Sequence, residues 1–193
     1  IMEDCFMKKI SLIDEDFMDF PIGEFPYDKN HSAIGEYHFI HFPGFYGRWY
    51  DPVCNYRYNG QGASWCIMEY NGRHYMEQMR LHNTEPHRTF PTLETGDRFW
   101  RDYDIEAGLR MFNTKWGSAG IGFCAQNSLN LLACIFEDKK LKLVYRHKEN
   151  VEEIKSVDFD YNCDDTYNIK VSVKGNHVIC SVDGSTYIDV QTD

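Results

Sequence analysis

Apolar and polar residues alternate through most of the second half of the chain, in short runs separated by turn residues. A period of two places successive side chains on opposite faces of an extended strand, so the alternation indicates strands with one buried face. It predicts strands over 98–112, 119–126, 129–136, 140–147, 166–174, 177–183 and 185–190. A further strand is expected over 151–160, where Val151, Ile154 and Val157 are spaced less regularly.

The connections between these strands have the length and composition of hairpin turns. The segments EDKK, KGNH and DGS carry Gly, Asn or Asp, which are residues that tolerate the positive φ of tight turns. Successive strands are therefore expected to pair antiparallel.

The first half is rich in Tyr, Phe, Gly, Pro and His and contains few clean alternations. Strands are expected over 35–42 and 64–70, segment 73–81 fits either a strand or a single helical turn, and 4–17 is ambiguous. Short strands at a spacing of roughly 8–12 residues are typical of two packed sheets. We predict an all-β fold, a two-sheet antiparallel β-sandwich or jelly roll, which forms a single domain over 1–193.

Charge changes the picture by excluding classes of partner. The chain has 20 Lys and Arg against 30 Asp and Glu, which gives a net charge of −10. Binding to nucleic acid or to an anionic membrane requires a basic surface, so neither partner is expected. No window approaches the ~20 apolar residues of a membrane-spanning helix, and residues 1–10 lack the apolar core of a signal peptide.

The cysteines bear on the metal and redox chemistry of the chain. The seven are Cys5, Cys54, Cys66, Cys124, Cys134, Cys163 and Cys180. Their odd number and wide spacing exclude a zinc ribbon. Cys124, Cys134 and Cys180 lie within apolar runs, so we interpret them as reduced, buried core residues, which favours a cytoplasmic protein and leaves an extracellular one as the alternative.

Four motifs follow one another in the second half. They are DYDIE at Asp102 to Glu106, GIGFCA at Gly120 to Ala125, LKL at Leu141 to Leu143, and the segment from Tyr167 to Gly184, which ends in VDG. This succession resembles the concanavalin A-like lectin/glucanase superfamily, whose laminin-G-like jelly rolls are often attached to carbohydrate-active enzymes. The resemblance covers about residues 98–190. Members include lectins, glycosidases, lyases and spacer domains, so it implies the fold more closely than the function.

Asp102, Asp104 and Glu106 are the candidate catalytic residues. Period two places the three carboxylates on one face of a strand, at about 6.5–7 Å spacing. They resemble the E-x-D-x-E strand of laminarinase-like glycosidases, in which one end carboxylate is the nucleophile and the other the general acid; retaining hydrolysis needs two carboxyls about 5–5.5 Å apart. The alternative, which we favour, is a solvated strand face. The residues at the other alternate positions are expected to face the core; they are Tyr103, Ile105, Ala107 and Leu109.

Aromatic and arginine side chains are the candidate ligand-binding residues. Sugar CH faces stack on aromatic rings, while hydroxyl groups suit planar donors and carboxylate acceptors. The candidates are Arg48, Trp49, Tyr50, Trp65, Trp100, Arg101, Arg110 and Trp116. Segment 44–52 is the favoured binding loop, and the alternative is that each Trp covers the edge of the core.

The sequence contains candidate ligands for two kinds of metal site, a transition-metal site and a calcium site. His38 and His41 are poor candidates for a transition metal, because residues three apart on a strand face opposite sides. His82 and His87 flank an NTEP turn, and we interpret these histidines as scattered surface or hydrogen-bonded residues. The superfamily resemblance makes calcium the candidate cofactor, with hard oxygen ligands drawn from Asp16, Asp19, Asp28, Asp183 and Asp189. Chance clustering among 30 acidic residues is the alternative.

These patterns together predict a carbohydrate-binding β-sandwich that acts as a non-catalytic module or attached domain of a glycan-processing protein. Its partner would be an oligosaccharide or polysaccharide, together with further domains of a longer polypeptide. Two alternatives remain open: a glycoside hydrolase or polysaccharide lyase that uses the carboxylates at 102–106, and a structural or protein-interaction spacer domain.

Overall fold

The computed structural model describes residues 10–24, 49, 65–78, 92–97, 99–112, 117–127, 129–148 and 150–192. Within these ranges the chain forms eleven strands, turns and irregular segments, and no helix. In this part of the chain there is accordingly no long apolar helix that could cross a membrane. The predicted strand at 35–42 lies outside the described residues, and the described part of segment 4–17 forms no helix.

One four-stranded sheet is a meander of consecutive strands. Its strands are β5 (Ala119–Asn127), β6 (Asn130–Glu137), β7 (Lys140–His147) and β8 (Asn150–Asp158). Every neighbouring pair is antiparallel and the spatial order follows the sequence. The strands predicted in this region are therefore confirmed, including the less regular one at β8.

The second four-stranded sheet brings an early strand beside late ones. Its order is β11 (Ser185–Gln191), β10 (His177–Val182), β9 (Thr166–Lys174) and β4 (Asp104–Arg110), all antiparallel. β4 is shorter than the predicted strand at 98–112. The chain turns where the Trp100 N–H donates to the Asp97 carbonyl at 3.0 Å, and Asp102 has a positive φ of 52°, so extended structure starts only after it.

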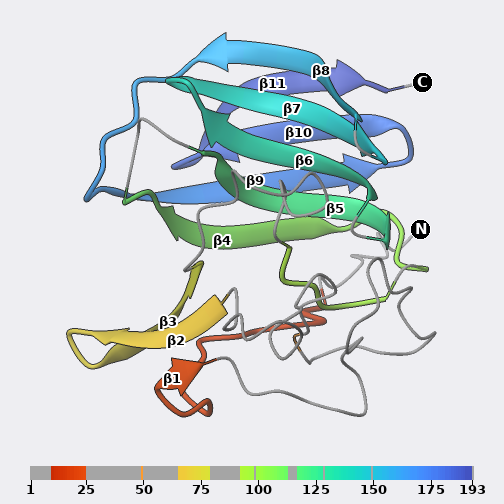
Figure 1. Cartoon of the computed structure of the whole chain (residues 1–193). Coiled ribbons are helices and arrows are strands. Elements are labelled where there is room, and N and C mark those ends of the chain that lie inside the picture. Colours follow the sequence, from red (N-terminus) through yellow and green to blue (C-terminus); the bar gives the residue numbers. More distant parts are fainter. Residues whose placement is uncertain are drawn as a thin grey trace, which may run out of the picture.

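The two sheets face each other and enclose the core (Figure 1). Alternate residues of β5, β7, β9 and β10 point inward, as the sequence alternation requires, and Leu141, Leu143, Ile169 and Val171 are fully buried, whereas most of β8 is exposed. Phe136 lies at the centre of an aromatic cluster, with its ring centroid 5.2 Å from Phe159, 5.2 Å from Tyr161 and 5.4 Å from Tyr167. The predicted all-β sandwich is confirmed.

The predicted burial of the cysteines is confirmed for two of the three core candidates. Cys134 and Cys180 are fully buried, whereas Cys124 is exposed, so its prediction as a core residue is wrong. The β5–β6 register shifts after Phe123, and Cys124 has a φ of 51°. Ile121 and Phe123 are buried, so the period of two already places Cys124 on the opposite, outward face of β5. The Cys124 N–H donates to the Tyr103 hydroxyl at 2.9 Å.

A third, three-stranded sheet lies beside β4 (Figure 1). It has the order β1 (Gly23–Glu24), β2 (Trp65–Tyr70) and β3 (Arg73–Gln78), with antiparallel pairing. β2 and β3 form a hairpin whose turn residues Asn71 and Gly72 have φ of 52° and 72°, as a tight hairpin turn requires. The strand predicted at 64–70 and the strand alternative for 73–81 are confirmed, while β1 is too short to show a period in sequence.

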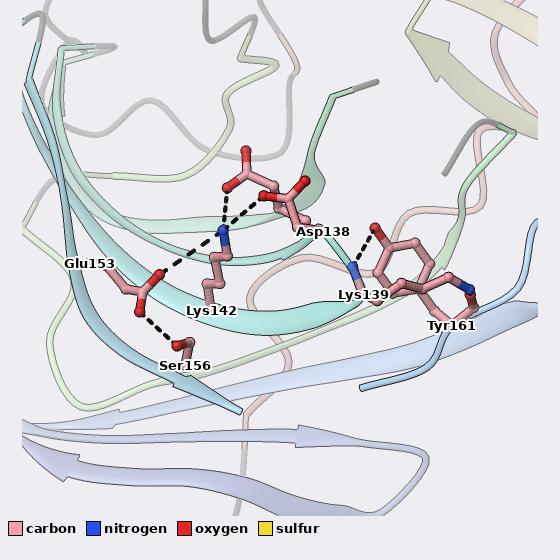
Figure 2. A network of polar contacts seen from close by, with 7 residues as sticks. Asp138, Lys139, Lys142, Glu153, Ser156 and Tyr161 are labelled. Carbon is pink, nitrogen blue, oxygen red and sulfur yellow. Dashed lines mark hydrogen bonds and ion pairs between the residues drawn. The ribbon is translucent and has the colours of Figure 1, made fainter. Parts of the chain in front are cut away.

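An ion-pair network holds β8 against the β6–β7 turn (Figure 2). Lys142 Nζ lies 2.7 Å from Glu137 Oε2, 3.4 Å from Asp138 Oδ2 and 4.0 Å from Glu153 Oε2, and Ser156 donates to Glu153 at 2.6 Å. The hydrogen bond to Glu137 raises the pKa of the Lys142 ammonium, so it stays charged. The one ammonium offsets part of the negative charge of the three carboxylates and links them across the turn and β8.

Candidate functional site

Arg110 at the end of β4 is surrounded by two exposed aromatic rings and a carboxylate. Its guanidinium carbon lies 5.9 Å from the centre of the Tyr70 ring and 5.3 Å from that of Phe112. Its Nη2 donates to Asp164 Oδ1 at 2.8 Å. Tyr70 is 61% exposed and Phe112 55% exposed, so both rings remain open to a ligand. We call these four residues the Arg110 cluster.

The cluster is assembled from three segments by strand pairing and alternation. The β4–β9 register pairs Arg110 with Thr166, which brings Asp164, in the turn before β9, next to the guanidinium. Met111 is buried, so Arg110 and Phe112 on either side of it share the outward parity. Tyr70 comes from the last position of β2, at the tip of the hairpin.

The electrostatics of the cluster favour a stable, paired cation. The Asp164 carboxylate, as hydrogen-bond acceptor, raises the pKa of the Arg110 guanidinium, so the charge persists at every physiological pH. Arg110 Nε is buried and has no hydrogen-bond partner among the described residues. The guanidinium is in cation–π contact with both rings, and its hydrogen bond to Asp164 adds a directional contact.

Such an arrangement can hold a flat, hydroxylated ligand. The exposed rings offer faces for apolar CH groups, and the arginine–carboxylate pair offers both donors and acceptors at a fixed angle. No metal or nucleophile is required for this chemistry. Within the described residues, no three His, Cys, Asp or Glu side chains are grouped so as to hold a metal ion.

Of the five predicted ligand-binding residues that the structure describes, Arg110 is the one in this cluster. Trp49 is half-buried, with its ring 5.6 Å from Phe17 and its Nε1 donating to Glu15 Oε2 at 3.3 Å. Trp100 packs over Gly96, where an added Cβ would lie 2.7 Å from the indole. Arg101 is exposed and donates to the Trp100 carbonyl at 2.8 Å.

The remaining predicted ligand-binding residues are placed as follows. Trp65 is half-buried at the start of β2, and its Nε1 is buried without a hydrogen-bond partner in the described part of the chain. Arg48, Tyr50 and Trp116 lie outside the described residues. The sequence reasoning missed Tyr70, Phe112 and Asp164. Of these three, only Phe112 could have been predicted from the sequence, because it lies two residues after Arg110 and so points to the same side of the chain.

The candidate catalytic carboxylates have other partners. Asp104 and Glu106 face outward on β4, while Ile105 and Leu109 pack against the core, as expected. Asp104 Oδ2 lies 3.1 Å from Lys170 Nζ, and Glu106 Oε1 accepts from Asn168 Nδ2 at 2.7 Å.

Two details of the strand predicted to carry the catalytic carboxylates are wrong. Asp102 precedes β4 rather than lying on it, and its Oδ1 accepts from the Gly175 N–H at 2.7 Å in the β9–β10 turn. Ala107 is exposed rather than part of the core face. The positive φ of Asp102 and its contact with the turn remove it from the row of carboxylates. Its role as a catalytic group stays a prediction, as do those of Asp104 and Glu106.

The predicted calcium ligands lie in separate elements. Asp16 accepts from the Met18 N–H at 3.0 Å, Asp183 accepts from the Asn168 N–H at 2.9 Å, and Asp189 lies 2.5 Å from His177 Nε2. Asp19 is in the turn after Asp16. Asp28, His38, His41, His82 and His87 lie outside the described residues. The calcium site therefore stays a prediction.

The comparison with known proteins gives a structural likeness and no family. The sequence matches no family model, and no curated protein matches it. The structure is similar to the carbohydrate-binding module CBM66 from Bacillus subtilis, with 14% sequence identity and a TM-score of 0.45. The likeness covers 49% of this chain and 61% of that module, so this chain spans about three fifths of the module's length. A likeness at this level does not identify a shared function.

Proposed function

We propose that this β-sandwich is a carbohydrate-binding domain and that the Arg110 cluster contacts the sugar. The observation that carries the proposal is a guanidinium in cation–π contact with two rings that are more than half exposed. Exposed aromatic surface costs free energy in water, and ligand binding removes that surface from solvent.

The chemistry of the four side chains suits a sugar ring. Tyr70 and Phe112 can cover CH faces, while Arg110 and Asp164 supply a donor and an acceptor for neighbouring hydroxyl groups. The domain would act as a non-catalytic module attached to a glycan-processing protein. The motif succession that resembles the concanavalin A-like superfamily falls on β4 to β11 and supports the same assignment.

We expect Tyr70→Ala and Phe112→Ala each to weaken glycan binding by about ten-fold or more, which corresponds to ~1.4 kcal/mol. Each change removes one stacking face and leaves the sandwich core intact. A glycan array would find the ligand, and isothermal titration would measure the affinity of each variant. Phe99→Ala is the matched control, because Phe99 is 57% exposed and lies at the opposite end of β4; its affinity should equal that of the wild type.

The same assay separates the proposal from a spacer domain. If the folded wild-type chain binds no glycan at millimolar concentration, the two rings only hold the β2–β3 hairpin on the sandwich. If it binds a glycan and the Phe99 variant loses as much affinity as the other two, binding occurs elsewhere on the molecule.

The hydrolase alternative depends on Asp104 and Glu106, which both face outward on β4. We expect Glu106→Gln to leave the affinity within two-fold of wild type, because the glutamine carbonyl can still accept from Asn168. Neither protein should shorten the bound glycan, as judged by mass spectrometry of the ligand after long incubation. Cleavage by the wild type that is lost in Glu106→Gln would instead establish a glycosidase.

A further inference from the structure

Two buried cysteines face each other from the two sheets of the sandwich. Cys134 lies on β6, where the register pairs it with Ile121 and Leu143, and both neighbours are core residues. Cys180 lies on β10, where it pairs with Val171 and Ile188, which also point into the core. Directly paired residues share a face of their sheet, so both thiols point inward.

The two thiols meet in the core. Both cysteines are 0% exposed and belong to the same buried cluster. The Cys180 thiol, as hydrogen-bond partner, and burial together raise the pKa of the Cys134 thiol. A protonated, buried thiol is unreactive, so any bond between them has to form while the chain folds rather than afterwards.

We propose that Cys134 and Cys180 form a disulfide that links the two sheets when the chain folds in an oxidising compartment. The oxidant would be a small-molecule disulfide such as oxidised glutathione. The Cys134 thiolate attacks the glutathione disulfide and releases one glutathione. The Cys180 thiolate then attacks the Cys134 sulfur of the mixed disulfide and releases the second. The two thiols lose two protons and two electrons, and one glutathione disulfide becomes two glutathiones.

The positions of the other described cysteines favour this pair. Cys66 and Cys163 are half-buried and Cys124 is exposed, and none of the three belongs to the buried cluster that contains Cys134 and Cys180. Cys66 lies on β2, outside the sandwich. The bond would connect the second strand of one sheet to the second strand of the other and would restrict the unfolded chain between them.

The test uses the full chain with Cys124→Ser, so that tryptic peptide 116–139 contains Cys134 as its single cysteine. Peptide 175–193 contains only Cys180. The reduced, unfolded protein is refolded in oxidised and reduced glutathione, blocked with iodoacetamide in denaturant, digested and analysed by mass spectrometry. We expect the two peptides to be joined, with the loss of two hydrogens, and to separate on reduction with dithiothreitol.

Thermal unfolding of the same protein gives a second readout. We expect the oxidised form to have a Tm roughly 5–15 °C above that of the reduced form. Recovery of both cysteines as alkylated peptides from refolded, natively folded protein would overturn the proposal. A linked pair with a Tm at or below that of the reduced form would also overturn it, because the native packing would then not accommodate the bond.

Discussion

Alanine at Gly120 should destabilise the sandwich by roughly 2–4 kcal/mol and lower its Tm by about 5–15 °C. A Cβ on Gly120 would lie 2.0 Å from the Cys134 carbonyl oxygen and 2.7 Å from the Ile135 Cα. Both atoms belong to the backbone of β6, an inner strand of its sheet, so neither can rotate away. The free energy of unfolding, measured by urea titration, would report the loss.

Gly108→Ala is the matched control for this prediction. Gly108 is also a strand glycine, but the nearest atom to an added Cβ is the Thr166 methyl group at 3.7 Å, an ordinary contact. We expect this variant to be as stable as the wild type or up to about 1 kcal/mol more stable, because alanine restricts the unfolded chain. Equal losses at the two positions would show that close approach of β5 and β6 is not the cause.

Phe136→Ala should cost about 3–5 kcal/mol of folding free energy, the range for truncating a fully buried aromatic side chain. The ring is 0% exposed and lies against Tyr167 on the facing strand β9 and against Phe159 and Tyr161, which follow β8. Its removal leaves a cavity that backbone-fixed strands cannot close. Chemical denaturation measures the loss, and Phe136→Leu, with a smaller expected loss, replaces it if the alanine variant does not fold.

Phe112→Ala is the counterpart on the surface. Phe112 is 55% exposed and its described contact is with Arg110, so we expect less than about 1 kcal/mol. The two phenylalanines should thus separate folding from binding: Phe136→Ala removes stability, and Phe112→Ala removes affinity. A stability loss at Phe112 as large as at Phe136 would contradict the assignment of Phe112 to an open ligand surface.

The cluster's position would let the sandwich carry the proposed binding surface without disturbing its core. Arg110 and Phe112 extend outward from β4 at an edge of the second sheet, while their neighbours Leu109 and Met111 anchor the same segment in the core. The β2–β3 hairpin supplies Tyr70 from outside the sandwich. Substitutions of these outward-facing residues are therefore expected to change the proposed ligand preference at little cost in stability.

The sequence by itself determined the strands of the sandwich and their antiparallel pairing along the meander. These follow from local rules: alternation with period two decides which side chains are buried, and short turns with Gly, Asn or Asp decide that neighbours pair. The same rules identified Cys134 and Cys180 as core residues and Asp104 and Glu106 as an outward face.

Only the tertiary structure decided where β4 pairs, where β5 is bulged and which residues surround Arg110. β4 pairs with β9 across several intervening strands, and such long-range pairing leaves no mark in the local pattern. The Cys124 bulge depends on a register shift against β6. Tyr70, Phe112 and Asp164 come from three segments that are far apart in the chain. Their meeting depends on how the third sheet packs beside β4, and residue type and local periodicity carry no information about that packing.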